Sequence, residues 1–236
     1  MNYLNQNNAW DGLGSVTNIY ELKQDGPNAG KFESLIGAKD KIVFILLALS
    51  RKRILFPYPY TPNNSDPICR ADDFENPSGG KRPLSGPCSK CQNAEWGVKA
   101  STGEPIPPAC MEIYELFGWD CEEKVPFTMN IKRTSIPALK DLKKKIALAV
   151  MKYDENDAPI HMSLKIEASS EKIPYGPKFY YENRFNIVEM ADSETIKKIA
   201  KKSGEMLSLI MPKTKILLPM TREQALPAPK QNSPED

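Results

Sequence analysis

The sequence has a single histidine, His161, and no glycine-rich phosphate-binding motif. Without a P-loop or a Gly-x-Gly-x-x-Gly run, nucleotide hydrolysis and dinucleotide chemistry have no support. His161 stands at the start of a predicted strand with no nucleophile motif beside it, so we interpret it as a structural residue. These absences lead us to expect that the protein is not an enzyme.

Long hydrophobic stretches are missing as well. The longest apolar run, Ile42 to Leu49, has eight residues, far fewer than a helix needs to cross a bilayer. The asparagine-rich N-terminus lacks the basic and apolar regions of a secretory signal. We therefore expect an intracellular, cytoplasmic protein with no membrane partner, and its 40% hydrophobic content permits a real core.

A large net charge is also lacking, because 32 basic residues nearly balance 30 acidic ones and leave a net charge of +2. Binding of a polyanion would therefore depend on local basic patches rather than on the field of the whole molecule. Such patches occur at Arg51–Arg53 and at Lys132–Arg133. Lysines also cluster in residues 136–150 and 193–211, where helically spaced apolar residues favour solvated helix faces.

Four cysteines form the most informative pattern that is present, a C-x18-C-x2-C-x18-C array of Cys69, Cys88, Cys91 and Cys110. The two-residue gap lets both thiolates of a tight turn face one metal ion. The surrounding stretch is rich in proline and glycine and is unlikely to form a helix or a long strand, so it needs a cross-link to become ordered. Zinc bound to thiolates contributes on the order of 10 kcal/mol to the free energy of folding. We predict a structural, tetrahedral zinc site with these four ligands.

Three other interpretations of the cysteines compete with this one. A catalytic zinc is disfavoured because four thiolates leave no coordination position for water. Two disulfides are disfavoured because zinc is the commoner partner of C-x2-C in a chain without a secretory signal. The fifth cysteine, Cys121, follows Cys110 by eleven positions and could exchange with it as a ligand.

Branched and aromatic residues predict five strands, at residues 41–49, 110–119, 125–132, 161–168 and 178–189. A helix is predicted at about 136–151, between the third and fourth strands, and another at about 193–211, capped by Ser193. This order is expected of an oligonucleotide-binding (OB) barrel, which is a five-stranded Greek-key barrel. Such barrels use two loops to bind single-stranded nucleic acid, and the loop at 172–177 would be one of them. A mixed α+β zinc domain is the alternative.

The chain divides into three predicted parts. Residues 1–35 are an N-terminal arm that could pack on a neighbouring copy of the chain. Residues 36–212 form the mainly β, OB-like domain, with the zinc-binding insertion at about 61–110 between the first and second strand groups. Residues 213–236 are rich in proline and polar residues, a composition typical of a disordered tail.

Four short motifs carry a resemblance to a protein family. They are Pro67-Ile68-Cys69-Arg70-Ala71-Asp72-Asp73, Cys88-x2-Cys91-x4-Trp96-Gly97, Pro108-Ala109-Cys110-x3-Tyr114, and Pro126-Phe127 with Lys132-Arg133-Thr134-Ser135-Ile136. These motifs, within about positions 40 to 190, resemble phage-encoded, zinc-containing single-stranded DNA-binding proteins. The resemblance implies an OB-type fold, binding of single-stranded DNA with little sequence preference, and a role beside replication or recombination proteins in the host cytoplasm.

Single strands are held by a basic groove with aromatic rings on which bases stack. Residues with this chemistry occur in three stretches, and the candidates for DNA binding are Arg51, Lys52, Arg53, Tyr58, Tyr60, Phe127, Lys132, Arg133, Tyr180 and Arg184. Prolines among residues 56–60 favour an extended backbone that exposes at least one tyrosine. The alternative for each ring is core packing. Trp96 is predicted to cover the zinc site.

Two other functions remain open at this point. One is a zinc-stapled protein-interaction or regulatory module that has no nucleic-acid role. The other is a metal-dependent nuclease built around Asp72 and Asp73. Single-strand binding predicts an affinity that falls steeply with salt and is nearly indifferent to base sequence, which neither alternative requires.

Overall fold

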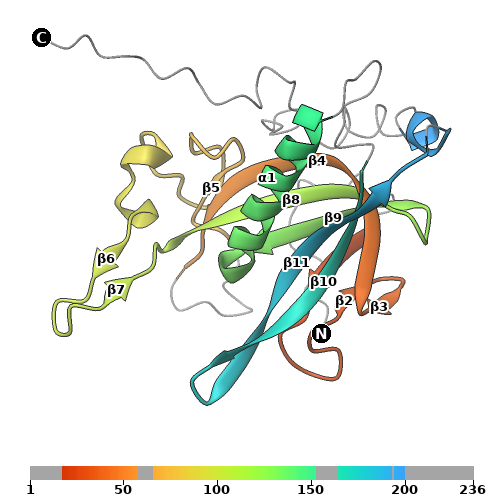
Figure 1. Cartoon of the computed structure of the whole chain (residues 1–236). Coiled ribbons are helices and arrows are strands. Elements are labelled where there is room, and N and C mark those ends of the chain that lie inside the picture. Colours follow the sequence, from red (N-terminus) through yellow and green to blue (C-terminus); the bar gives the residue numbers. More distant parts are fainter. Residues whose placement is uncertain (1–17, 58–65, 153–163, 193, 200–236) are drawn as a thin grey trace, which may run out of the picture.

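The computed structural model describes residues 18–57, 66–152, 164–192 and 194–199 of the 236-residue chain. Its main feature is a nine-stranded sheet that curls around a hydrophobic core (Figure 1). The strands of this sheet are β1 (Asn18–Leu22), β2 (Phe32–Ser34), β3 (Gly37–Lys39), β4 (Lys41–Leu55), β5 (Cys69–Ala71), β8 (Cys110–Asp120), β9 (Val125–Lys132), β10 (Leu164–Tyr175) and β11 (Lys178–Met190).

Outside this sheet the described elements are short, apart from one helix. The helix α1 (Ile136–Lys152) follows β9 through the 3-10 turn η4 (Arg133–Ser135). Between β5 and β8 the chain forms two 3-10 turns and a small separate hairpin. These elements are η2 (Cys88–Lys90), η3 (Gln92–Ala94), β6 (Gly97–Val98) and β7 (Pro105–Ile106).

The strand order along the sheet is β11-β10-β4-β8-β9-β1-β2-β3, with β5 paired to the end of β4. The neighbours β10, β4, β8 and β9 are antiparallel, whereas β1 runs parallel to β9. The long strand β4 lies at the centre, and its residues 44–50 are all buried. Burial on both faces of the sheet explains why its apolar run is continuous rather than alternating.

The core lies on the concave side of the sheet and is closed by α1. Leu139, Leu142 and Ile146 recur at helical spacing, are at most 1% exposed, and belong to the same cluster as Phe44 and Phe127. Each such side chain contributes on the order of 1.5–3 kcal/mol through its burial. A second apolar cluster lies on the other face of β4 and includes Ile199 of the helical residues 194–199.

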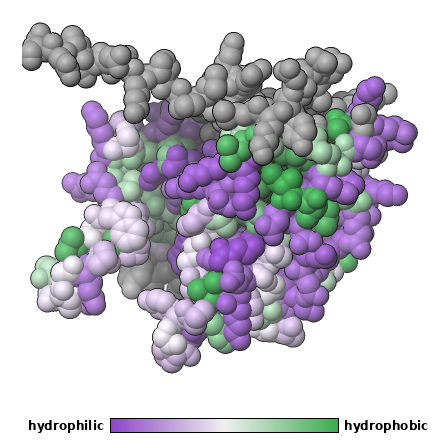
Figure 2. Space-filling model, viewed as in Figure 1, coloured by the Kyte–Doolittle hydropathy of each residue, from purple (hydrophilic) through white to green (hydrophobic). Residues whose placement is uncertain are grey.

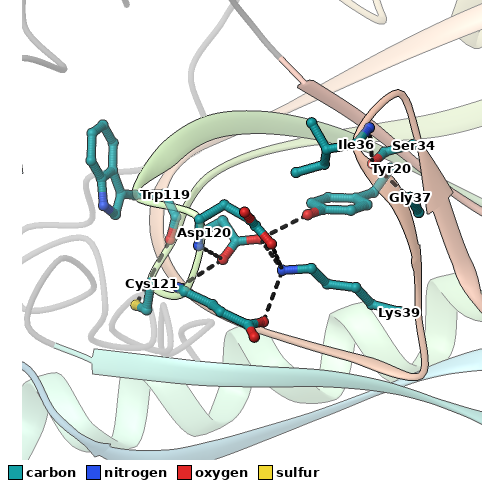
Figure 3. Close-up of polar contacts among 10 residues, drawn as sticks. Tyr20, Ser34, Ile36, Gly37, Lys39, Trp119, Asp120 and Cys121 are labelled. Carbon is teal, nitrogen blue, oxygen red and sulfur yellow. Dashed lines mark hydrogen bonds and ion pairs between the residues drawn. The ribbon is translucent and has the colours of Figure 1, made fainter.

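A buried polar cluster joins the N-terminal strands to the turn between β8 and β9 (Figure 3). The Tyr20 hydroxyl donates to the fully buried carboxylate of Asp120 at 2.8 Å, and Lys39 lies 3.4 Å from the same carboxylate. Asp120 also accepts hydrogen bonds from the backbone N–H groups of Glu122 and Glu123 at 2.8 and 3.0 Å. Burial, followed by the Asp120 hydrogen bond, raises the pKa of Tyr20 above its ordinary value.

The sequence-based prediction of a mainly β chain is confirmed, and the predicted strands and the helix at 136–151 are present. One detail is wrong. Residues 18–35 are not a separate arm, because β1 and β2 are part of the sheet. At the start of the last helical segment, the Asp192 carboxylate accepts from the Thr195 backbone N–H at 2.7 Å.

Several predicted features fall outside the described residues. They are Ser193, His161, residues 1–17 of the predicted N-terminal arm, the later part of the predicted helix at 193–211, and the tail at 213–236. Within the part of the chain that is described, no helix is long and apolar enough to cross a membrane.

Candidate nucleic-acid interface and cysteine cluster

A groove of about 760 Å³ opens where the ends of β1, β9 and β11 meet the turn before α1. It brings together residues that are far apart in the sequence and that combine aromatic rings with positive charge. Its lining includes Phe56, Lys132, Arg133, Tyr180 and Tyr181. Three of the predicted DNA-binding residues, Lys132, Arg133 and Tyr180, are therefore neighbours in one groove.

The positive charges of the groove come from the end of β9. Burial alternates over the last four residues of this strand, so Ile131 points into the core while Lys132 is exposed. Arg133 follows with a φ of 47°, in the left-handed region that residues other than glycine rarely adopt. This strained position turns the chain into α1 and holds Arg133 at the groove, and such strain is concentrated at binding sites.

The aromatic wall of the groove is fixed by contacts from β11 to distant segments. The Gln24 side chain donates to the Tyr181 carbonyl at 2.8 Å and accepts from the Tyr181 N–H at 2.9 Å. The Tyr181 ring packs on Gly30, where an added Cβ would lie only 2.6 Å from the ring. Ser135 accepts the Asn183 N–H at 2.9 Å. The wall is thus held in place without a ligand.

Asn183 also lines the groove and carries an unusual acceptor. Its side chain is only 3% exposed, and its Oδ1 atom is buried without a hydrogen-bond partner among the described residues. A buried acceptor left without a donor costs about 1–3 kcal/mol. A residue of the groove lining therefore has a buried acceptor that is not satisfied among the described residues.

Three other predicted DNA-binding cations already have partners inside the protein. The Arg51 Nε lies 2.7 Å from Glu112, and the Lys52 Nζ lies 3.0 Å from Glu115. Arg184 forms ion pairs with Glu171 and Glu182 and does not line the groove. These cations would have to leave a carboxylate in order to contact a phosphate.

The remaining predicted residues have different outcomes. Phe127 is 1% exposed and packs edge-on against Tyr20 and Phe44, so the prediction that it stacks on a base is wrong. Arg53 is half-buried near the cysteines. Tyr58 and Tyr60 lie outside the described residues, although Phe56, which closely precedes that segment, lines the groove.

The prediction omitted Tyr181 and Asn183. Strand alternation placed Tyr180 and Arg184 on one face of β11, and this reasoning excluded the residues between them. The groove, however, lies at the edge of the sheet formed by β11, so side chains from both faces of the strand line it. A run of two tyrosines at a strand end was the available signal.

Lysines of α1 were expected to form a solvated face, and this is confirmed for Lys140, Lys144 and Lys145, which are exposed. In Figure 2 hydrophilic residues cover much of the face on which α1 lies. Lys143 differs, because burial lowers its pKa below the ordinary value.

The predicted zinc ligands lie at the far end of β4. Leu55 is paired with Cys69 of β5 on one side and with Cys110 of β8 on the other, so the three side chains point to the same face of the sheet. Cys88 and Cys91 bracket the turn η2, in which the Cys91 N–H donates to the Cys88 carbonyl.

All five cysteines are free thiols, and three of the four predicted ligands are buried. Burial raises the pKa of Cys110 to about 11, and the charges of the other three cysteines add to this increase. Burial likewise raises the pKa of Cys88. The described residues contain no group of three or more His, Cys, Asp or Glu side chains arranged to hold a metal ion.

Two ideas about this cluster are wrong. Cys121 cannot exchange with Cys110, because it follows the opposite end of β8, roughly 30 Å away along an extended strand. It belongs instead to the second apolar cluster, with Phe117. Trp96 does not cover the cysteines, since it is 69% exposed.

The carboxylates Asp72 and Asp73 are engaged within their own turn. Asp72 pairs with Arg70 at 3.0 Å. Asp73 accepts the backbone N–H groups of Glu75 and Asn76 at 2.8 and 2.7 Å. Partial burial opposes ionisation of Asp73, but these hydrogen bonds prevail and keep its pKa below the ordinary value. Both carboxylates thus have local structural partners.

Comparison with known proteins adds no further site. No protein-family model, curated protein or solved structure matches the chain.

Proposed function

We propose that this protein binds single-stranded DNA with little sequence preference, and that it coats and protects single strands during phage DNA replication or recombination. The observation that carries the proposal is the groove, which places Lys132 and Arg133 beside the rings of Phe56, Tyr180 and Tyr181. Every base has a π face, so stacking on such rings is tolerant of sequence, and cations beside them bind the backbone.

We infer that the sheet is an OB-type barrel. In the chain order β4, β8, β9, α1, β10, β11, the strand β10 returns to pair with β4, as the Greek key of this fold requires. Single strands bind such barrels on the face of the second and third strands and at two loops. Met111 and Asn130 of β8 and β9 line the groove, as does Phe56 at the start of the first of these loops.

We propose that Cys69, Cys88, Cys91 and Cys110 hold a structural zinc ion. Support comes from the two thiols that flank Leu55 on one sheet face, from the adjacent turn η2, and from the contribution of the neighbouring cysteines, after burial, to the raised pKa values of Cys88 and Cys110. Bound zinc would stabilise the segment from residue 66 to 109, whose described elements are short, by an amount on the order of 10 kcal/mol.

The binding proposal is tested by titrating a fluorescent 30-nucleotide oligo-dT, and a duplex of the same length, with the full-length protein while anisotropy and strand integrity are followed. We expect salt-sensitive binding to the single strand without cleavage. Tyr180→Ala should weaken binding about 5- to 150-fold, because a stacked base contributes about 1–3 kcal/mol. Trp96→Ala, which removes an exposed ring outside the groove, is the matched control. Absence of binding at low salt would refute the proposal.

A zinc-stapled protein-interaction module is the second candidate. The observation that favours it is the β6–β7 hairpin, which projects away from the main sheet (Figure 1) and exposes Val98 and, just before it, Trp96. In this case Trp96→Ala would abolish binding to a protein partner, and the single strand would not bind at any salt concentration.

A further inference from the structure

Lys143 differs from the other lysines of α1 in its surroundings. Its side chain is half-buried, whereas Lys140 and Lys145 are exposed. Among the described residues, the one ion pair within α1 joins Lys145 to Asp141, so Lys143 has no carboxylate partner there. Withdrawing an ammonium group from water is costly unless an anion compensates its charge. Lys143 therefore carries a positive charge for which the described part of the chain supplies no anion.

Two further cations lie near the Lys143 ammonium group. Lys140 precedes it by three positions, so the two side chains are neighbours on the surface of α1. Arg51 comes from β4, and its Cζ lies 5.4 Å from the centre of the Tyr114 ring, which belongs to the same core cluster as Leu142 of α1. Burial, followed by the charges of Arg51 and Lys140, lowers the pKa of Lys143. We call these three residues the α1 cation cluster.

Arg51 is fixed within this cluster. Its Nε lies 2.7 Å from a carboxylate oxygen of Glu112, and its Cζ lies 3.4 Å from the centre of the Phe74 ring. Phe74 has a φ of 70°, and the backbone N–H groups that follow it donate to Asp73, which stabilises this turn. Arg51 therefore stays on Glu112 and supplies charge, while the two lysines are available to a ligand.

The α1 cation cluster adjoins the groove. Met111 lines the groove, and Glu112, the partner of Arg51, follows it on β8. Arg133 lines the groove just before α1, and Lys143 is seven residues beyond the first residue of this helix, or about 10 Å along its axis. Nucleotides of one strand rise about 3.4 Å each in a duplex, so about three nucleotides bridge this distance.

We propose that Lys140 and Lys143 form a second phosphate-binding site for the single strand, which reaches it by leaving the groove along α1. This inference rests on the proposed binding of single-stranded DNA. A phosphate is a compact anion with several acceptor oxygens, and lysine binds it as a point charge. Contacts to the backbone carry no base information, which agrees with binding that has little sequence preference.

The test uses the full-length protein and two fluorescent oligo-dT strands. A 30-nucleotide strand can fill both sites, whereas a strand of about 4 nucleotides, the lower limit of the site size of one OB fold, can fill only the groove. Lys140→Gln/Lys143→Gln removes both ammonium groups and keeps the pair of Arg51 and Glu112. The matched control, Lys197→Gln/Lys198→Gln, removes two exposed lysines from residues 194–199, whose Ile199 packs on the other face of β4.

Anisotropy titrations at several salt concentrations give the slope of log affinity against log salt. With the long strand, Lys140→Gln/Lys143→Gln should reduce the magnitude of this slope by about 1.4, about 0.7 for each lost phosphate contact. The control should keep the wild-type slope, and the short strand should bind the variant and the wild type equally. The variant relieves repulsion among like charges, so urea unfolding should show it at least as stable as the wild type.

A second arm separates a path for the strand from a site for any anion. Acetylation of Lys143 in the wild type is followed by mass spectrometry in the presence of the long strand, the short strand or inorganic phosphate at the same ionic strength. We expect the long strand alone to protect Lys143. Equal protection by inorganic phosphate or by the short strand, no protection by a bound long strand, or a variant with the wild-type slope would overturn the second site. A wild type that binds neither strand at low salt would instead overturn the proposed function itself.

Discussion

Neutralising the two basic residues of the groove should change how DNA binding depends on salt. Lys132 and Arg133 are both exposed and line the groove beside its rings, so each can contact one phosphate. Log affinity falls as log salt rises, and the magnitude of this negative slope decreases by about 0.7 for each phosphate of a single strand that the protein no longer neutralises. The double variant Lys132→Gln/Arg133→Gln should therefore lower the slope by about 1.4.

This change of slope determines how strongly the ratio of wild-type to variant affinity depends on salt. Between 50 and 200 mM salt, a slope change of about 1.4 corresponds to about a sevenfold difference in affinity. The ratio of wild-type to variant affinity should thus be about sevenfold larger at 50 mM than at 200 mM salt. Anisotropy titrations of oligo-dT at several salt concentrations between these limits measure it directly.

The control for this experiment is Lys144→Gln/Lys145→Gln. It removes the same charge from exposed residues of α1 that do not line the groove, and it should leave the slope unchanged. The reasoning is refuted if the groove variant keeps the wild-type slope, or if both double variants weaken binding by the same factor at every salt concentration.

Three further predictions concern stability. Asp120→Ala leaves the buried Tyr20 hydroxyl without its acceptor, whereas Lys39 keeps its ion pairs with Glu122 and Glu123, so the free energy of unfolding in urea titrations should fall by about 1–3 kcal/mol; an unchanged midpoint would contradict this. Burial opposes ionisation of Glu112, but the hydrogen bond from Arg51 prevails and lowers the pKa of the Glu112 carboxyl group in the folded protein. The ionised carboxylate therefore stabilises the fold fully above the ordinary pKa of glutamate, and this stabilisation is lost as the pH falls through the lowered pKa of the folded state. Urea unfolding should therefore show Glu112→Gln less stable than wild type by about 1 kcal/mol at pH 7, with the gap closing as pH falls below the ordinary pKa of a glutamate, whereas a gap independent of pH would argue against an ionic role. Zinc removal by a chelator should make residues 66–109 sensitive to protease, reversibly on zinc addition, and an unchanged digestion pattern would count against the staple.

The regular elements could be predicted because their signals are local. Branched and aromatic residues identify β4, β8 and β9, and the spacing of Leu139, Leu142 and Ile146 identifies α1. The position of the cysteine-rich segment between the first two long strands follows from chain order alone. The short strand β1 was missed because it has only five residues and is stabilised by parallel pairing with β9 and by Tyr20.

The candidate site was only partly predictable because it depends on partners that are distant in the sequence. Lys132 and Tyr180 share a groove, but Lys52 is turned to a carboxylate on the neighbouring strand, which its own sequence context does not reveal. Phe127 follows the usual fate of strand aromatics and lies in the core. Gln24 and Gly30 have no motif at all, and their importance comes from their contacts with Tyr181.

The central claim is that the single strand lies in this groove, and ultraviolet cross-linking of oligo-dT to the full-length protein, followed by tryptic digestion and mass spectrometry, tests it most directly. We predict cross-links in the peptide Phe179–Arg184 and in the peptide that contains Phe56, the two sources of the groove's rings. Cross-links confined to the peptide that contains Trp96, or an absence of cross-links at salt concentrations where the strand is bound, would contradict the account.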